Sequence, residues 1–467
     1  MIYDIIIIGA GSGGLNIAMF MIRIGFKVLL IDKTDKSIGG DCLNHGCVPS
    51  KALIHCAKLA HGAKESEHFG LKVSGKIDLK KVMNYIDDKK EYIRVHENAS
   101  YFRKKGIDVA LGEARFVSEN EVEVSGKTFK GKKIVIATGS KPRKLNVPGI
   151  ENVDVINNEN VFSMKKLPQK MLFIGGGPIS LEISQAFNRL GVECLVIIRG
   201  NKFLPKENIE ISNILKNRLE KEGIKFLFNS NPMEFTSKNE CIINNNGIKT
   251  KVSFDNVFVG IGRVLNYNNL DLDKANIKTH EKGIEVNEYL QTTNPNVFLC
   301  GDIAGSYQFT HAAELHAGVI LSNFFKPGLF WKKLNNDNLN WVTFTQPEIA
   351  TFGINEKEIK NRKLKYKKLS LDFKDDDRAI VDDYKDGKML LYVDNKNNLL
   401  GGSVIAPNAG EMFQELVLAK ANKLKINAFF NKIYSYPTST RVNKKIIGNL
   451  MSEKLTPFIK GLLRFLY

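Results

Sequence analysis

Hydrophobic residues gather in short runs along the chain, and glycine-rich or polar segments separate these runs. Residues 5–8 are four isoleucines, a β-branched run of strand length, and a helical pattern at 15–24 and a second strand at 27–31 follow. The same order returns later, with a strand at 171–174, a helix that reaches Leu190 and a strand at 193–198. Strand, helix and strand in this order predict two parallel α/β units of the Rossmann type.

The last third of the chain has a different pattern. It contains an apolar strand at 389–393 and a helical stretch at 411–420, and the polar segment 335–338 separates it from the preceding residues. We therefore predict an α/β protein with two Rossmann-like dinucleotide-binding domains and a C-terminal α+β domain. The expected divisions are an FAD domain at 1–148 and 267–333, a nicotinamide domain at 149–266, and an interface domain at 334–467.

Composition narrows the class of protein. The 467 residues are 43% hydrophobic, and no run reaches the roughly 20 apolar residues that cross a bilayer. The first residues lack the positive start of a signal peptide, so we expect a cytoplasmic protein. The net charge of +18 comes from lysines spread along the chain. Without a basic-aromatic binding module this charge does not predict a nucleic-acid partner, although it can attract an anionic nucleotide.

The first glycine cluster has the full context of a dinucleotide fingerprint. Gly9, Gly11 and Gly14 follow the first strand and open the first helix, and Asp32 ends the second strand. The glycines allow a tight turn, a close approach to pyrophosphate and close helix–strand packing, and the carboxylate can accept a hydrogen bond from a ribose hydroxyl.

The second cluster repeats this arrangement with one informative change. Gly175 and Gly177 follow the strand, and Ser180 stands where the third glycine would be. Beyond the second strand the chain carries Arg199, with Lys202 and Lys206 nearby, where a carboxylate would favour NADH. An arginine there favours the extra phosphate of NADPH. An incidental surface arginine is the alternative.

Cys42 and Cys47 carry the candidate chemistry. Four residues separate them, a spacing that one helical turn can bring to disulfide distance. They precede a helical run at 51–59, and a helix N-terminus with a nearby cation favours the reactive thiolate. There is no second Cys pair or His pair at zinc-binding spacing, so we expect no metal site. The four other cysteines suit packing: Cys56, Cys194, Cys241 and Cys300.

Around these cysteines the chain closely resembles the pyridine nucleotide-disulfide oxidoreductase family, which includes dihydrolipoamide dehydrogenase, glutathione reductase and mercuric reductase. The resemblance covers nearly the whole chain and favours the mercuric reductase-like branch. It rests on the segments 39–51, 137–142, 260–263, 300–305, 310–313 and 344–350. It implies FAD, a homodimer, and hydride flow from NADPH, with NADH less favoured, through FAD to a Cys42–Cys47 disulfide.

The resemblance also implies individual roles. Cys47 would lie under the flavin, Cys42 would meet the substrate, and Lys51 and Glu182 would form an ion pair near the nicotinamide, with a simple buried salt bridge as the alternative. The fingerprints and the resemblance together assign to FAD the residues Gly9, Gly11, Gly13, Gly14, Asp32, Lys33, Gly40, Asp41, Lys51, Thr138, Gly139, Ser140, Gly301, Asp302 and Ala312. They assign to NADPH the residues Gly175, Gly177, Pro178, Ile179, Glu182, Arg199, Gly260, Gly262 and Arg263.

Two positions depart from the family's thiol reductases. Where those enzymes have a His base and an orienting Glu, this chain has Tyr436 and Arg441. A phenol is a poor base at neutral pH, so exchange with glutathione disulfide or lipoamide is in doubt. The adjacent-cysteine pair of mercuric reductases is also absent from the end of the chain. The acceptor is therefore open: a disulfide, a metal ion or another small molecule, or else a quinone. A flavoprotein component of an assembly is the third alternative.

The C-terminal segment predicts a short basic amphipathic helix. Thr456 and Pro457 suit a helix start, apolar residues form one stripe, and Lys460 and Arg464 lie off it. Such a helix can lie in a membrane interface, although packing within the dimer is the favoured interpretation of the sequence.

Overall fold

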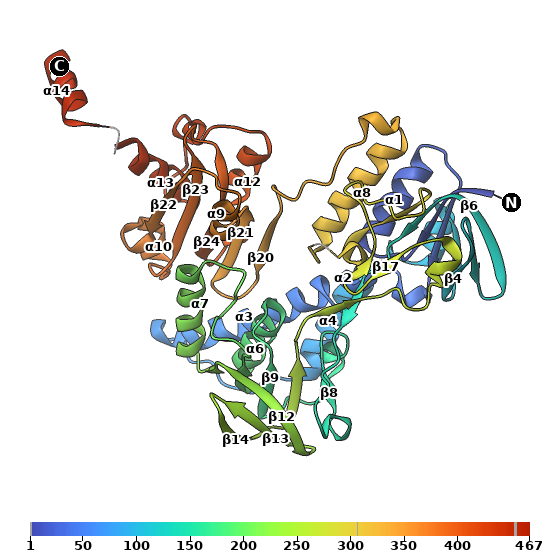
Figure 1. Ribbon diagram of the computed structural model, residues 1–467. Coiled ribbons are helices and arrows are strands. Elements are labelled where there is room, and N and C mark those ends of the chain that lie inside the picture. The colour runs from blue at the N-terminus through green and yellow to red at the C-terminus, as the bar shows by residue number, and fades with distance from the viewer. Residues whose placement is uncertain (1, 306, 453–454) are drawn as a thin grey trace. The chain divides into compact units, whose positions relative to one another are not determined.

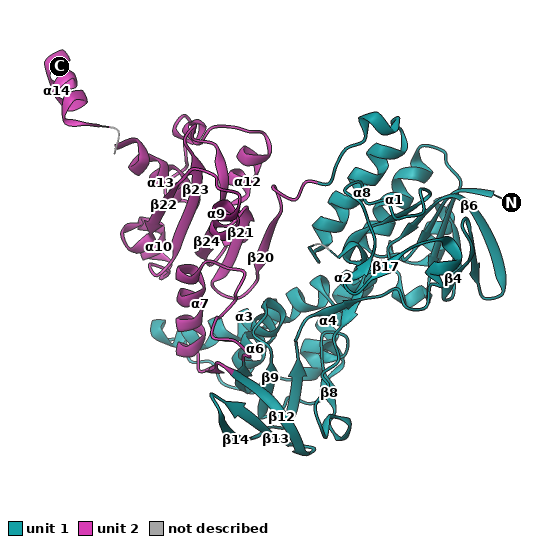
Figure 2. Cartoon of the chain, in the orientation of Figure 1, with its two compact units in different colours: residues 1–197, 230–334 teal, residues 198–229, 335–467 magenta. Residues whose placement is uncertain are grey.

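The computed structural model describes residues 2–305, 307–452 and 455–467. The chain divides into two compact units (Figure 2). Unit 1 contains residues 1–197 and 230–334, and unit 2 contains residues 198–229 and 335–467.

The first sheet of unit 1 is largely parallel. Its strands run in the order β3-β2-β1-β6, with β19 also paired to β6, and the antiparallel strands β5 and β4 extend it. Alternate residues of β1 belong to the hydrophobic cores on the two faces of the sheet. Helices α1 and α8 lie side by side against one face (Figure 1). The strands are β1 (Ile2–Ile8), β2 (Val28–Asp32), β3 (Asp108–Leu111), β4 (Ala114–Ser118), β5 (Glu121–Val124), β6 (Lys127–Ile136) and β19 (Val297–Leu299).

A second parallel sheet of unit 1 runs in the order β10-β9-β15-β8. The antiparallel strands β12, β13 and β14 form a separate sheet, and β7 pairs with β16. The strands are β7 (Ser140–Pro142), β8 (Val155–Ile156), β9 (Lys170–Ile174), β10 (Glu193–Ile197), β12 (Ser230–Ser237), β13 (Glu240–Asn245), β14 (Ile248–Ser253), β15 (Asn256–Val259) and β16 (Arg263–Leu265), with a short pair β17 (Thr279–His280) and β18 (Gly283–Ile284).

The helices of unit 1 join the two parallel sheets. α3 packs against α4 and also against α6, the helix that follows β9. This packing brings the first fingerprint region and the second into one unit. The helices are α1 (Ser12–Arg23), α2 (Gly40–Asn44), α3 (Cys47–Glu65), α4 (Leu79–Arg94), α5 (Ala99–Lys104), α6 (Pro178–Arg189) and α8 (Thr310–Phe324).

Unit 2 is built on an antiparallel sheet with the order β20-β21-β24-β23-β22. Its core is apolar and is formed by the sheet with the following helices. The strands of this sheet are β20 (Asn340–Thr343), β21 (Glu348–Gly353), β22 (Tyr366–Asp372), β23 (Lys388–Asp394) and β24 (Leu399–Ala406). The short strand β11 (Lys225–Leu227) belongs to unit 2 but not to this sheet. The helices are α7 (Ile209–Lys221), α9 (Glu356–Asn361), α10 (Asp377–Val381), α11 (Ala409–Met412), α12 (Gln414–Ala421), α13 (Arg441–Ser452) and α14 (Pro457–Leu466).

The elements follow the hydrophobic pattern, with two differences. α3 begins at Cys47 and not near residue 51, because Pro49 lies in the first helical turn, where its missing N–H leaves no hydrogen bond unmade. The helix predicted at 411–420 is divided between α11 and α12, with Phe413 between them. The strand predicted at 389–393 lies within β23, and the C-terminal helix starts as expected. The domain divisions at 148, 266 and 333 stay a prediction.

Candidate active site

The first fingerprint forms a cradle that only glycines fit. Gly9 has a φ of +111°, and a Cβ atom there would lie 2.4 Å from the carbonyl oxygen of Ala137. A Cβ at Gly14 would lie 2.0 Å from the carbonyl oxygen of Gly9, so helix α1 can pack on β1 only without a side chain. A Cβ at Gly40 would lie 2.7 Å from the Cα of Gly11. The turn after β1 and the start of α2 therefore approach each other backbone to backbone.

Asp32 lies at the carboxyl end of β2, beside this turn. Its carboxylate accepts hydrogen bonds from the Ala10 amide at 2.6 Å, from the Lys33 amide at 2.7 Å and from the Ser37 hydroxyl. Lys33 itself pairs with Glu113 at 3.1 Å on the surface. Asp32 is thus held at the carboxyl end of β2, and its role toward a ribose stays a prediction.

A second polar group surrounds the crossover at β7. The Ser140 hydroxyl donates to Asp302 at 2.5 Å, and the Arg263 guanidinium donates to the Ser140 hydroxyl at 2.7 Å. Arg263 also pairs with Asp41 at 3.2 Å and lies 3.9 Å from Asp302. Burial raises the pKa of Asp302. The structure therefore places Arg263, which the sequence assigned to NADPH, among residues assigned to FAD.

These residues fit FAD. Thr138 has a buried hydroxyl with no hydrogen-bond partner in the structure, and a Cβ at the neighbouring Gly139 would meet open space. An unmatched buried hydroxyl beside a glycine cradle is what a polar ligand would satisfy. Gly301 donates its amide to the imidazole Nδ1 of His316, 3.1 Å away, and burial lowers the pKa of His316 to about 4. His316 is therefore neutral near pH 7 and fixes the loop before α8 without adding charge.

Cys42 and Cys47 lie on successive helices. Cys42 belongs to α2, and Cys47 is the first residue of α3; both are free thiols in the structure. The hydroxyl of Thr310, at the start of α8, lies 3.4 Å from the Cys47 sulfur. Two chain segments 263 residues apart thus meet at this sulfur.

The environment separates the two thiols electrostatically. A hydrogen bond from Cys42, another from Thr310 and the charge of Lys51 lower the pKa of Cys47 to about 6, although burial opposes them. The hydrogen bond to Cys47, together with burial, raises the pKa of Cys42. The position of Cys47 at a helix N-terminus favours its thiolate further. At neutral pH the pair holds one proton on Cys42 and a thiolate on Cys47.

Lys51 and Glu182 form the predicted ion pair. The Lys51 Nζ lies 2.7 Å from a Glu182 carboxylate oxygen, and the Glu182 side chain is only 7% exposed. Lys51 comes from α3, one turn after Cys47, and Glu182 comes from α6. The pair therefore links the cysteine helix to the helix that follows the second fingerprint.

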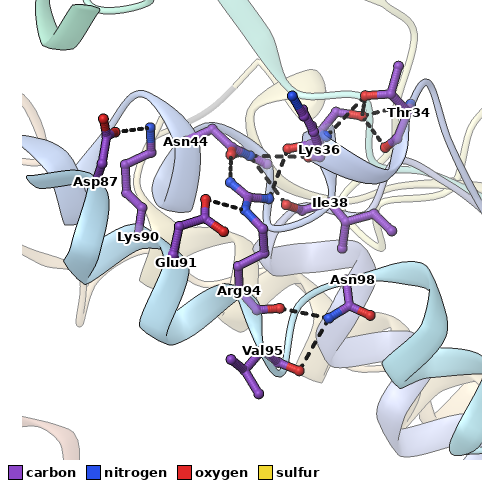
Figure 3. A network of polar contacts seen from close by, with 12 residues as sticks. Thr34, Lys36, Ile38, Asn44, Asp87, Lys90, Glu91, Arg94, Val95 and Asn98 are labelled. Atoms are coloured by element: carbon purple, nitrogen blue, oxygen red, sulfur yellow. Dashed lines mark hydrogen bonds and ion pairs between the residues drawn. The ribbon is translucent and has the colours of Figure 1, made fainter. Parts of the chain in front are cut away.

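A polar network behind α2 was not found from the sequence (Figure 3). Arg94, on α4, donates to the Asn44 side chain at 2.6 Å and to the Lys36 carbonyl at 3.1 Å. Asn44 in turn donates to the Gly40 carbonyl at 2.8 Å and to the Ile38 carbonyl at 3.2 Å. Arg94 and Asn44 thus hold the loop and short helix that carry Cys42. No local sequence signal identifies them, because the contact joins segments 50 residues apart.

The second fingerprint has the same backbone geometry as the first. Gly175 has a φ of +110°, and a Cβ there would lie 2.3 Å from the Gly260 carbonyl oxygen. A Cβ at Gly177 would meet nothing within 4 Å, which leaves the amide end of α6 open. Pro178 is the first residue of α6, and the next residue, Ile179, is exposed. A nucleotide pyrophosphate suits such a helix start.

Tyr436 belongs to unit 2. It is 65% exposed, and its hydroxyl donates to Asp377 at 3.2 Å. This hydrogen bond raises the pKa of Tyr436, so the phenol does not act as a base near pH 7. The Arg441 guanidinium lies 5.1 Å from the ring centre, and the Tyr436–Pro437 peptide is cis.

Residues 3–317 match the sequence model of the family described as pyridine nucleotide-disulphide oxidoreductase, and residues 339–446 match its dimerisation domain. The chain belongs to this family. Mercuric reductase of Staphylococcus aureus is 30% identical over 93% of this chain and 80% of its own length. Dihydrolipoyl dehydrogenase of Chlamydia trachomatis is 31% identical over 94% of this chain and 95% of its own length.

The fold also matches solved structures. The Cu(II) complex of the HOCl-induced flavoprotein disulfide reductase RclA from Escherichia coli has a TM-score of 0.83 at 22% identity, covering 96% of this chain and 99% of that one. This likeness concerns the fold alone. Membership in the family confirms an FAD- and NAD(P)H-dependent oxidoreductase with two Rossmann-like domains, and its dimerisation domain supports a homodimer.

The structure adds two negative findings. Among residues 2–305, 307–452 and 455–467, no three His, Cys, Asp or Glu side chains are grouped as metal ligands. In the same part of the chain, no helix combines the length and apolar character needed to cross a membrane.

Proposed function

We propose that this flavoenzyme takes hydride from NADPH and delivers electrons through the Cys42–Cys47 pair to a small acceptor. The observation that carries the proposal is the thiol pair itself: Cys47 begins α3 with its sulfur 3.4 Å from the Thr310 hydroxyl, and Lys51, which pairs with Glu182, follows on the same helix. A purely structural pair of cysteines would need neither a stabilised thiolate nor a second thiol that retains its proton.

FAD, when bound, accepts hydride from the nicotinamide and makes its electrons available to the disulfide. Reduction breaks the Cys42–Cys47 bond and needs two electrons and one proton to give the state described above. The proton resides on Cys42, and Cys47 remains a thiolate beside the Lys51 ammonium. The protein stabilises this state through the Lys51 charge and the hydrogen bonds from Cys42 and Thr310 to the Cys47 thiolate.

The nature of the acceptor follows from what Tyr436 cannot do. A disulfide acceptor needs a base that removes the proton from Cys42, and the Asp377-bound phenol does not supply one. A soft metal ion binds sulfur as thiolate, so it can bind Cys47 directly and release the proton of the Cys42 thiol to solvent when that sulfur also binds. We therefore favour a soft metal ion, the type of substrate named for the mercuric reductases, over glutathione disulfide or lipoamide.

Anaerobic turnover with a panel of acceptors tests this proposal. The holoenzyme would be reduced with NADPH and mixed with Hg(II), Cu(II), glutathione disulfide, lipoamide or a quinone. We expect metal reduction that Cys42→Ser abolishes. Cys56→Ser, the same atomic change on α3, should leave metal reduction intact. Quinone turnover that persists in Cys42→Ser, without metal reduction in the wild type, would instead show that the cysteines only store electrons.

The coenzyme preference rests on Arg199. It is exposed and follows β10 by one intervening residue. A charge-assisted hydrogen bond to the 2′-phosphate contributes about 1.5–3 kcal/mol, so we expect at least about a tenfold preference for NADPH in kcat/KM. Arg199→Glu should remove or reverse it. An unchanged preference would show that the arginine is incidental.

The active site would be completed by the homodimer. We propose that Tyr436 faces Cys42 of the partner subunit, because the family places a base from the second subunit at this position. A cytoplasmic location stays a prediction from the sequence.

We also propose that α14 lies on an anionic membrane surface. None of its residues is buried, and Phe458, Phe465 and Leu466 are each at least 70% exposed. Lys460 and Arg464 lie on the opposite side, where they can contact lipid phosphates. The bilayer is favoured over a second copy of the chain because the apolar stripe is accompanied only by positive charges, and the whole chain has a charge of +18.

Vesicle sedimentation tests this second proposal. The holoenzyme should sediment with phosphatidylglycerol vesicles and much less with phosphatidylcholine vesicles. The Lys460→Glu/Arg464→Glu double variant should stay in the supernatant, whereas Lys396→Glu/Lys423→Glu, an equal charge change in unit 2, should still sediment. Equal sedimentation of the two double variants would contradict the membrane proposal. So would a larger oligomer that forms without vesicles and that Phe465→Asp dissociates.

A further inference from the structure

The loop that carries Arg199 belongs to the compact unit of the dimerisation domain. Residues 198–208 run from β10 to α7, and Arg199, Lys202 and Lys206 are all exposed on it. Two backbone hydrogen bonds hold its first residues: the Ile198 amide donates to the Leu227 carbonyl of β11 at 2.8 Å, and the amide of Asn229, just after β11, donates to the Gly200 carbonyl at 3.1 Å. The middle of the loop buries Phe203 and Leu204.

The end of this loop is held by one carboxylate. The indole N–H of Trp341 donates to one Glu207 oxygen at 2.6 Å, and the hydroxyl of Thr351 donates to the other oxygen at 2.6 Å. Ser403 lies 2.9 Å from the Thr351 hydroxyl and can donate to it. Both carboxylate oxygens of Glu207 therefore accept a hydrogen bond, and Ser403 orients the Thr351 hydroxyl that makes one of them.

These donors form a row across three neighbouring strands. Trp341 on β20 is the register partner of Thr351 on β21, and Thr351 is the register partner of Ser403 on β24. Because cross-strand partners on one face stand close together, the sheet presents a fixed site for one carboxylate. The next residue strengthens the anchor: Asn208 caps α7 and donates to the Tyr392 hydroxyl at 3.1 Å.

We propose that Glu207 is a positioning residue for coenzyme recognition: it fixes loop 198–208 within its own compact unit and so restricts the conformations of Arg199, the residue proposed to bind the 2′-phosphate of NADPH. This inference rests on the proposed role of Arg199. The three exposed cations of the loop repel one another, and fixing the loop in advance lowers the entropy cost of binding an anionic ligand. Burial raises the pKa of Glu207, while its two donors and Lys206 oppose that rise.

Two ligands that differ in one phosphate measure this effect. Binding of 2′,5′-ADP and of 5′-AMP to the FAD-loaded dimer would be followed by calorimetry. Glu207→Leu should weaken 2′,5′-ADP at least about fivefold, a part of what one charge-assisted hydrogen bond contributes, and leave 5′-AMP within about twofold. Glu207→Gln should bind like the wild type, because its amide can accept from Trp341 and donate to Thr351.

Two further variants keep the result interpretable. Glu220→Leu makes the same change on α7, where Glu220 pairs only at the surface with Lys216, and should change neither affinity. Trp341→Phe removes one donor and keeps most of the packing, so it should show a smaller loss if Glu207→Leu does not fold. The positioning role would be overturned if Glu207→Leu and Trp341→Phe both kept the wild-type preference for 2′,5′-ADP over 5′-AMP while Arg199→Glu abolished that preference. A wild-type enzyme without discrimination would overturn the role of Arg199 and this inference together.

Discussion

The hydrogen bond from Cys42 makes the largest contribution to the low pKa of Cys47. Two variants of Cys42 can separate this contribution from those of Thr310 and Lys51. Cys42→Ala removes the donor, whereas Cys42→Ser keeps one, because a hydroxyl donates at least as well as a thiol. The two variants have nearly the same size and both prevent a disulfide. Any difference between them therefore reports the hydrogen bond.

The expected size follows from the structure. With a pKa of about 6, Cys47 is about nine-tenths thiolate at pH 7, compared with a few per cent for a thiol of ordinary pKa near 8.5. A hydrogen bond to a charged group contributes about 1.5–3 kcal/mol, or roughly one to two pKa units. We expect the lower end, about one unit, for Cys42→Ala, because the Thr310 hydrogen bond and the charge of Lys51 still stabilise the Cys47 thiolate.

The assay is the rate of Cys47 alkylation by iodoacetamide between pH 5 and 9, read by peptide mass spectrometry. The thiolate is the nucleophile, so the rate should rise with pH through the pKa and then level off. The midpoint should lie near 6 in Cys42→Ser and about one unit higher in Cys42→Ala. Equal midpoints in both variants, or midpoints near 8.5, would refute the account of the thiol pair.

Three other predictions concern separate parts of the molecule. Lys51→Met removes the ammonium 2.7 Å from the buried Glu182 carboxylate and should lower the free energy of unfolding by about 1–3 kcal/mol in urea titrations, whereas Lys170→Met, at an exposed pair, should change it by less than about 0.5 kcal/mol. Gly40→Ala places a Cβ against backbone and should abolish FAD retention on gel filtration; Gly62→Ala, which meets open space, should retain FAD. Tyr436→Phe should slow acceptor reduction but not flavin reduction by NADPH in stopped-flow measurements, and a slowed NADPH step would contradict its placement.

Local pattern was enough to predict the two fingerprints, because glycine spacing and strand runs report backbone geometry directly. Local pattern did not predict the Lys51–Glu182 pair, because 131 residues separate the two. That prediction came from the family resemblance. The Thr310–Cys47 contact and the Glu207–Trp341 anchor carry no local signal, because each depends on packing between distant segments. Arg263 shows the same limit. The sequence assigned it to NADPH, yet its three partners in the structure, Ser140, Asp41 and Asp302, are all residues assigned to FAD.

The central claim is that electrons are stored on both FAD and the cysteine pair, and an anaerobic dithionite titration of the holoenzyme tests it most directly. Each dithionite supplies two electrons, and the flavin and the disulfide each accept two. We predict that the wild-type enzyme consumes about two equivalents per FAD, with a long-wavelength absorption band after the first, and that Cys47→Ser consumes about one without that band. One equivalent and no band in the wild-type enzyme would contradict the claim.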